Sequence, residues 1–185
     1  MNNNDSIILG DAAGSGLVAR HEVNDFVGVA GKFIVTCRDA EGNIRWEDGF
    51  PNLVVTTGKN DLLNKYFLNS GTYTAAFFVG LKGTGAIAAG DIMASHAGWS
   101  EITGYSNGSR PAFSPASSTA GSSTNSASPA TFTINASNTV AGCFITTNST
   151  KSGTSPGILF SAADFASSRA VLSGDTLTVT YTVSC

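Results

Sequence analysis

The residues best suited to chemistry lie between His96 and Phe113, in the sequence HAGWSEITGYSNGSRPAF. Aromatic and charged side chains alternate here with turn formers, and Trp99, Tyr105 and Arg110 could form a surface on which a sugar ring stacks. In the alternative, structural interpretation, Trp99 closes one end of a β-sandwich and Arg110 pairs with Glu101. Packing and pairing account for these residue types without a ligand, so we predict that the stretch is structural.

Patterns that hold a metal ion or activate a nucleophile are absent from the sequence. The two histidines, His21 and His96, are far apart, and no HxH, HExxH or EF-hand spacing occurs. The serines lack a GxSxG elbow, and the glycine-rich stretch 82–90 lacks the Lys-Ser/Thr ending of a phosphate-binding loop. An ion in the loop 91–96 would need further ligands that only folding could supply. We therefore predict no metal, no cofactor and no enzymatic activity.

Composition narrows the class of protein further. Charged residues make up 12% of the 185 residues, about half the usual share of ~25%, while hydrophobic residues make up 42%. A net charge of −3 gives no basic surface for nucleic acid, and no apolar run approaches the ~18 residues of a membrane span. The start of the sequence lacks the charged and apolar regions of a secretory signal. These features predict neither nucleic-acid binding nor membrane association.

The three cysteines, Cys37, Cys143 and Cys185, are widely spaced and form no CxxC motif. One internal disulfide is possible. Three unpaired thiols in a reducing cytosol is the simpler interpretation, because an odd number of cysteines cannot all pair.

Alternation of apolar and polar residues predicts a mainly β protein, an antiparallel β-sandwich or jelly-roll-like domain. A hairpin is expected from KFIVTCR (32–38), with Phe33, Val35 and Cys37 inward, and its return strand 44–47. Further strands are expected at 52–57, 75–83, 99–103, 131–137, 142–148, 157–165 and 176–183. In the last of these Leu177, Val179, Tyr181 and Val183 should face inward, opposite Phe132, Ile134 and Phe144. The Ser/Thr/Ala-rich stretch 114–130 is predicted to be an exposed loop within one domain, residues 32–185.

One short α-helix is expected after the strand 52–57. Thr57 would cap it, and Leu62, Leu63, Tyr66 and Phe67 share one face. A helix of about a dozen residues is marginal alone, so we expect it to pack on a sheet.

Residues 1–31 are predicted to form an extended N-terminal arm. Its apolar residues stand in two short patches, Ile7-Ile8-Leu9 and Phe26-Val27, separated by several glycines. These patches are too short and interrupted to close a core of their own. We therefore predict that Ile7, Ile8, Leu9, Phe26 and Val27 bind a partner.

The chain resembles a family of small virion structural proteins of tailed bacteriophages over roughly residues 50–185. The resemblance is carried by LVVTTGKNDLLNKYF (53–67), AAFFVGLKG (75–83), HAGWSEITGYSNGSRPAF (96–113), NSASPATFTI (125–134), GCFITTN (142–148), GILFSAADF (157–165) and SGDTLTVTYTV (173–183), in that order. The resemblance supplies no catalytic residue.

Members of this family are usually described as head decoration, or cement, proteins, or simply as virion proteins of unknown role. The resemblance implies a capsid decoration protein on the capsid exterior of the virion, assembled in the host bacterial cytoplasm. Its expected partners are the major capsid protein and neighbouring copies of itself. The alternative is a receptor- or glycan-binding module of a tail or head fibre, with Trp99, Tyr105 and Arg110 as its platform.

Overall fold

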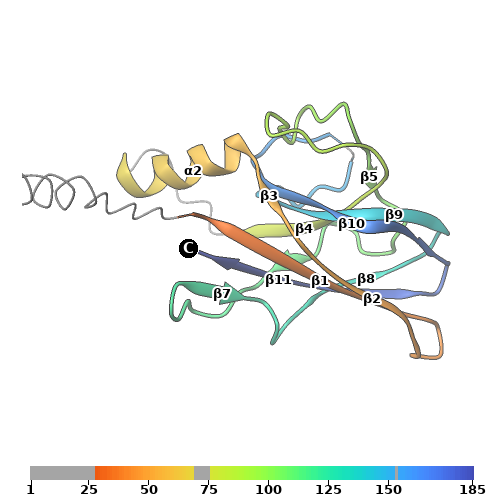
Figure 1. Ribbon diagram of the computed structural model, residues 1–185. Helices are drawn as coiled ribbons and strands as arrows, with labels where there is room; N and C mark the ends of the chain where they lie inside the picture. Colours follow the sequence, from red (N-terminus) through yellow and green to blue (C-terminus); the bar gives the residue numbers. More distant parts are fainter. Residues whose placement is uncertain (1–27, 69–75, 153) are drawn as a thin grey trace, which may run out of the picture.

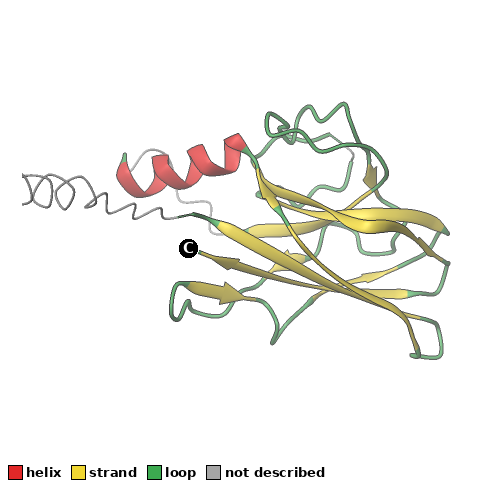
Figure 2. Ribbon diagram, viewed as in Figure 1, coloured by secondary structure: helices red, strands yellow, loops and turns green. Residues whose placement is uncertain are grey.

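The computed structural model describes residues 28–68, 76–152 and 154–185. These residues form two antiparallel β-sheets that face each other and one α-helix at an end of the pair (Figures 1 and 2). The predicted mainly β, antiparallel sandwich with one short helix is confirmed. Within the described residues no helix is long and apolar enough to cross a membrane.

The first sheet has five strands. Its central path runs β2 (Ile44–Pro51), β1 (Ala30–Arg38) and β11 (Thr176–Ser184), and β11 also pairs with β7 (Ser122–Thr124) and β8 (Ala130–Thr133). β1 and β2 form the expected hairpin, closed by a turn in which the Asp39 carboxylate accepts the backbone N–H groups of Glu41 and Asn43. β1 begins at Ala30, two residues before the expected start.

The second sheet has six strands. Its path runs β3 (Leu53–Val54), β10 (Leu159–Val171), β9 (Asn138–Thr146), β4 (Phe77–Lys82) and β5 (Glu101–Ile102), and β6 (Ala112–Phe113) also pairs with β4. The strand expected at 52–57 is only two residues long, because the helix begins at Thr56.

The main core fills the space between the sheets, and alternation places its residues as predicted. Phe33, Val35 and Cys37 of β1 are buried, and β11 buries Leu177, Val179 and Tyr181 while Val183 is half-buried. The expected partners of β11 were partly wrong. Phe132 lies beside Leu177 in the same sheet, and Phe144 belongs to a second cluster.

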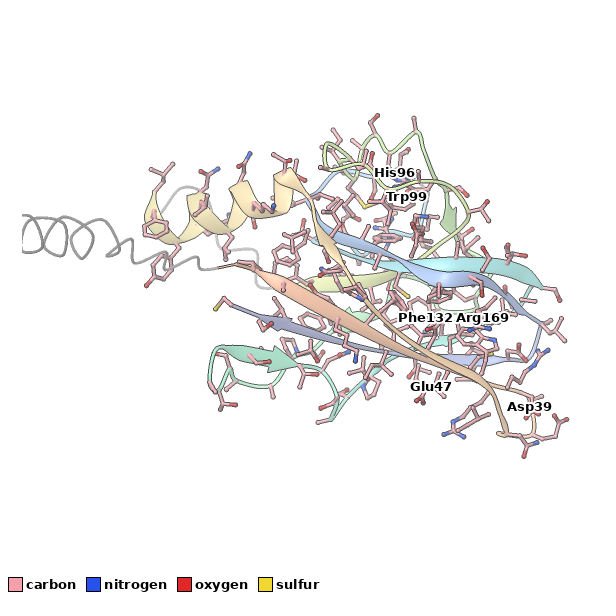
Figure 3. All side chains as sticks on the ribbon, in the orientation of Figure 1. Asp39, Glu47, His96, Trp99, Phe132 and Arg169 are labelled. Carbon is pink, nitrogen blue, oxygen red and sulfur yellow. The ribbon has the colours of Figure 1, made fainter. Side chains whose placement is uncertain are left out.

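That second cluster lies outside the pair of sheets, against the outer face of β9 and β10. Its buried members are Val55, Met93, Trp99, Phe144, Leu159 and Ala162. The segment between β4 and β5 covers this face and contributes Met93 and Trp99. β9 is therefore buried on both faces from Val140 to Thr146. Trp99 is buried as expected, but it packs on the outer face of a sheet and does not close an end of the sandwich (Figure 3).

Helix α2 (Thr56–Phe67) meets the second sheet through backbone. Gly58 is its only buried residue, and a Cβ atom there would lie 2.2 Å from the Phe160 carbonyl oxygen. The predicted cap was wrong: Val55 holds the N-cap position without a side-chain hydrogen bond, and the Thr57 hydroxyl instead donates to the Leu159 carbonyl at 2.9 Å. The helix is anchored to β10 by these two contacts.

The helix packs on the second sheet, as expected, but most of its apolar face does not make the contact. Gly58 meets β10 through backbone, and Leu62, one turn further on, is the apolar side chain nearest to that contact. Leu62, Leu63, Tyr66 and Phe67 are nevertheless exposed by 43, 51, 77 and 73%. Residues three and four apart share one side of a helix, so these four side chains form a continuous apolar surface.

The Ser/Thr/Ala-rich stretch 114–130 is mostly exposed, as expected, and does not divide the chain. It carries β7 and the first residue of β8, and a tight turn at Ala120-Gly121, both at positive φ, precedes β7. Residues on both sides of it contribute to one core.

Candidate protein-binding surface

Arg110 and Glu101 form the ion pair that the sequence predicted. Arg110 Nε and Nη2 donate to Glu101 Oε1 and Oε2 at 2.7 and 2.8 Å, and neither side chain has exposed surface. Arg110 Nη1 also donates to the Asn148 carbonyl at 2.7 Å and to the Ser155 hydroxyl at 3.3 Å. The charge of the guanidinium is therefore engaged within the fold.

The structure contradicts an exposed platform of Trp99, Tyr105 and Arg110. Their exposed fractions are 6, 0 and 1%. Tyr105 packs edge-on against Phe132, and burial raises the pKa of its hydroxyl well above the usual range. No sugar ring can stack on side chains that are covered by protein.

The loop that precedes β5 is held by polar contacts of its own. The Asp91 carboxylate accepts the Trp99 indole N–H and the Ala88 backbone N–H, both at 2.9 Å. The His96 ring stacks on Trp99 with 3.9 Å between centroids, and its Nδ1 lies 3.0 Å from the Trp99 carbonyl (Figure 3). No group of three or more His, Cys, Asp or Glu suited to a metal occurs in the described residues.

A pocket of about 410 Å³ opens beside this loop. It is lined by Ala94, Ser95, His96, Ala97, Trp99, Ser100, Glu101 and Thr154. Its carboxylate, Glu101, is neutralised by Arg110. The two titratable side chains of this pocket, His96 and Glu101, thus both make contacts within the fold.

Lys82 is a buried charge that the sequence pattern missed, because it ends an otherwise apolar strand. Its Nζ donates to Asp164 Oδ1 at 2.6 Å and to the carbonyls of Gly83 and Gly85 at 3.1 and 2.5 Å. The ammonium also lies 5.7 Å from the centroid of the Trp99 ring. Lys82 therefore ties the turn after β4 to β10 and to the second cluster.

The three cysteines are free thiols, so no internal disulfide forms. Cys37 and Cys143 are buried, and burial raises the pKa of Cys37 to about 12 and that of Cys143 above its usual range. Cys185 is exposed.

Exposed apolar residues concentrate on α2. Within the described part of the chain ten large apolar side chains are exposed, and five of them, Leu62, Leu63, Tyr66, Phe67 and Leu68, follow one another on or just after this helix. We name the outward side chains Leu63, Tyr66 and Phe67 the α2 ridge. An exposed apolar cluster of this kind commonly marks a contact with another protein.

An apolar groove of about 300 Å³ lies beside the ridge, and we name it the end groove. Both sheets and the helix line it, through Val29, Leu62, Phe77, Ser118, Gly121, Ser122, Ser123, Phe160, Val183, Ser184 and Cys185. Aromatic and branched apolar side chains form most of its walls, and serines form its rim. It lies at the same end of the sandwich as α2, the start of β1 and residue 185 (Figure 1).

The five residues predicted to bind a partner, Ile7, Ile8, Leu9, Phe26 and Val27, lie outside the described residues. The described chain begins at Gly28, and the next residue, Val29, lines the end groove. The N-terminal segment therefore joins the domain at the end that carries the ridge and the groove. The i, i+4 spacing of the helix revealed the apolar face, but such spacing does not show what covers that face.

Comparisons with known protein families and with curated proteins found no match to this chain.

Proposed function

We propose that the chain is a structural virion protein of a tailed bacteriophage, a decoration protein that binds the outer surface of the major capsid protein shell. The N-terminal segment and the α2 ridge would make the contact with the shell, and the sandwich would cover it. The role is one of binding, without catalysis.

The observation that carries this proposal is the α2 ridge. Tyr66 and Phe67 are exposed by 77 and 73%, although aromatic residues of this size are strongly driven out of water. Burying one large apolar side chain contributes ~1.5–3 kcal/mol to the free energy of binding. A partner that covers the ridge would gain this contribution from each side chain that it buries. A soluble domain gains nothing from keeping these side chains in water.

Two further features support a protein partner. The family resemblance covers α2 and most of the strands, and it implies a virion protein. Charged side chains are few, so the contact rests on apolar surface and should depend only weakly on salt.

The number of copies per particle tests the proposal. Quantitative mass spectrometry of purified particles of the phage that encodes the chain should find hundreds of copies, in fixed ratio to the major capsid protein. Immunogold labelling should then cover the head. A handful of copies at one vertex or on the tail, or none, would exclude a decoration role.

A further inference from the structure

The α2 ridge and the end groove are neighbouring surfaces, one projecting and one hollowed. Leu62 connects them, because it lines the groove and stands on the same helix as the ridge residues Leu63, Tyr66 and Phe67. Both surfaces are apolar, and none of the described residues that line the groove is charged. One end of the sandwich therefore presents a projecting apolar element beside an apolar recess (Figure 1).

The exposed area at this end is comparable with half of a small dimer interface. Leu62, Leu63, Tyr66, Phe67 and Leu68 are exposed by 43 to 77%. A fully buried aromatic side chain removes ~150–250 Å² from water, and on this scale the five residues together expose roughly 500 Å². Two such surfaces, each with part of a groove, amount to roughly 1,200 Å², which is the lower end of the range for specific, stable interfaces.

We infer that two copies of the chain form a two-fold dimer in solution, in which the α2 ridge of each copy occupies the end groove of the other. A two-fold interface uses the same patch on both copies, so the patch must contain both a projecting element and a recess that receives it. The ridge and the groove meet this requirement. Because Leu62 stands between them, it lies closest to the two-fold axis and faces Leu62 of the second copy.

The dimer covers the exposed aromatic residues of α2 in the absence of a shell. An interface of this modest area predicts a dissociation constant in the micromolar range. Such a dimer separates readily, so the ridge remains available for the shell contact of the proposed function, and a shell that binds the ridge displaces the second copy. The inference does not depend on that function, because it concerns the purified chain without particles.

Light scattering on the purified chain over a range of concentrations tests the dimer. The parent chain should change from one copy to two as its concentration rises through the micromolar range. Leu62→Glu places two like charges opposite each other at the axis, and it should raise the dissociation constant at least ~10-fold. The matched control is Leu172→Glu: Leu172 is similarly exposed but precedes β11, whereas the groove lies where β11 ends. This control should dimerise like the parent chain.

Two results of this measurement would overturn the inference. One is a parent chain that stays monomeric up to millimolar concentration, which would mean that no second copy covers the ridge. The other is an equal loss of dimer in Leu62→Glu and Leu172→Glu, which would mean that added charge acts without regard to its position.

Disulfide cross-linking shows which surfaces meet. One chain carries Tyr66→Cys together with Cys185→Ser, and it is mixed with the parent chain, whose Cys185 is exposed and lines the groove. Cys37 and Cys143 are buried, so mild oxidation should join the ridge of one copy to the groove of the other in a mixed dimer identified by its mass. Ile34→Cys in place of Tyr66→Cys should give little mixed dimer. Equal yields from the two, or dimers of the parent chain without any mixed product, would overturn the inference.

Discussion

The Arg110 guanidinium and the Glu101 carboxylate form a two-point ion pair with no exposed surface on either side chain. The two residues stand nine positions apart, and Arg110 adds bonds to the Asn148 carbonyl and the Ser155 hydroxyl. One buried cation thus joins β5 to the segment that follows β9. A pair of this kind stabilises only while both partners are present, since removing one leaves a buried charge unpaired.

Glu101→Gln should therefore lower the free energy of unfolding by ~3–5 kcal/mol, because the amide keeps the shape but leaves the guanidinium without its counter-charge. Urea unfolding followed by tryptophan fluorescence measures the change. The control is Glu47→Gln at an exposed position of β2, where the carboxylate accepts the Thr36 hydroxyl and the change should stay within ~0.5 kcal/mol. Equal losses in the two variants would contradict the role given to the buried pair.

Asn125 fills the gap between two short strands, β7 and β8, which both pair with β11. Its side chain makes the hydrogen bonds to β11 that a neighbouring strand would otherwise make. It accepts the Tyr181 N–H at 2.7 Å and donates to the Val179 carbonyl at 3.2 Å. Asn125→Ala should leave both buried groups unpaired at ~1–3 kcal/mol each, so thermal unfolding should occur at a clearly lower temperature. Ser126→Ala, on an exposed neighbour, should not shift it. If Asn125→Ala melted with the parent protein, water would have to satisfy both groups.

The strand pattern was predictable because the inward positions of a half-buried strand recur every two residues. Phe33, Val35 and Cys37 show this in β1, and Leu177, Val179 and Tyr181 show it in β11. The pairing of Glu101 with Arg110 was also predictable, because they are the two oppositely charged residues of the stretch 96–113.

Other features depend on contacts that only the fold creates. Asn125 stands in a low-complexity stretch, and its partners are 54 and 56 residues away. Lys82 finds Asp164 across 82 residues. The exposed face of α2 was misjudged because amphipathic spacing says that a helix has an apolar side and does not say what covers it.

Gly58 decides the placement of α2. In most helices Gly→Ala is stabilising by ~0.5–1 kcal/mol, but a Cβ atom here would lie 2.2 Å from the Phe160 carbonyl oxygen. Gly58→Ala should therefore push the helix from β10 and destabilise the protein by ~1–3 kcal/mol, as overpacking does elsewhere. Asn60→Ala, at an exposed position of the same helix, should be neutral or slightly stabilising. A stabilised Gly58→Ala protein, measured by thermal unfolding, would show that the contact relaxes without cost.

The thiols should divide into one reactive and two silent groups. The thiolate is the reactive form, and burial raises the pKa of Cys37 to about 12, so this thiol stays protonated at pH 8. Cys143 is buried as well, and its pKa is also raised. A chromogenic disulfide reagent at pH 8 should titrate one thiol, Cys185, in the folded protein and all three in denaturant. Rapid reaction of a second thiol in the folded protein would contradict the burial of Cys37 or Cys143.

The α2 ridge should matter for attachment and hardly at all for stability. Tyr66 and Phe67 contribute little to the core, being exposed by 77 and 73%, so replacing both with serine should leave the melting temperature nearly unchanged. If a partner buries both, the loss is ~3–6 kcal/mol, which corresponds to roughly 10²- to 10⁴-fold weaker binding. Occupancy on purified particles, measured with added variant protein, should fall accordingly.

The matched control for the ridge variant removes two exposed apolar residues from the β1–β2 hairpin. Ile34 and Ile44 lie on β1 and β2 and are exposed by 41 and 55%. Replacing both with serine makes a surface change of similar kind, yet attachment should remain at the parent level because these residues lie on the hairpin and away from α2. If the control lost attachment as severely as the ridge variant, binding would depend on general surface apolarity. If the ridge variant attached in full, the shell would be bound by another surface of the chain.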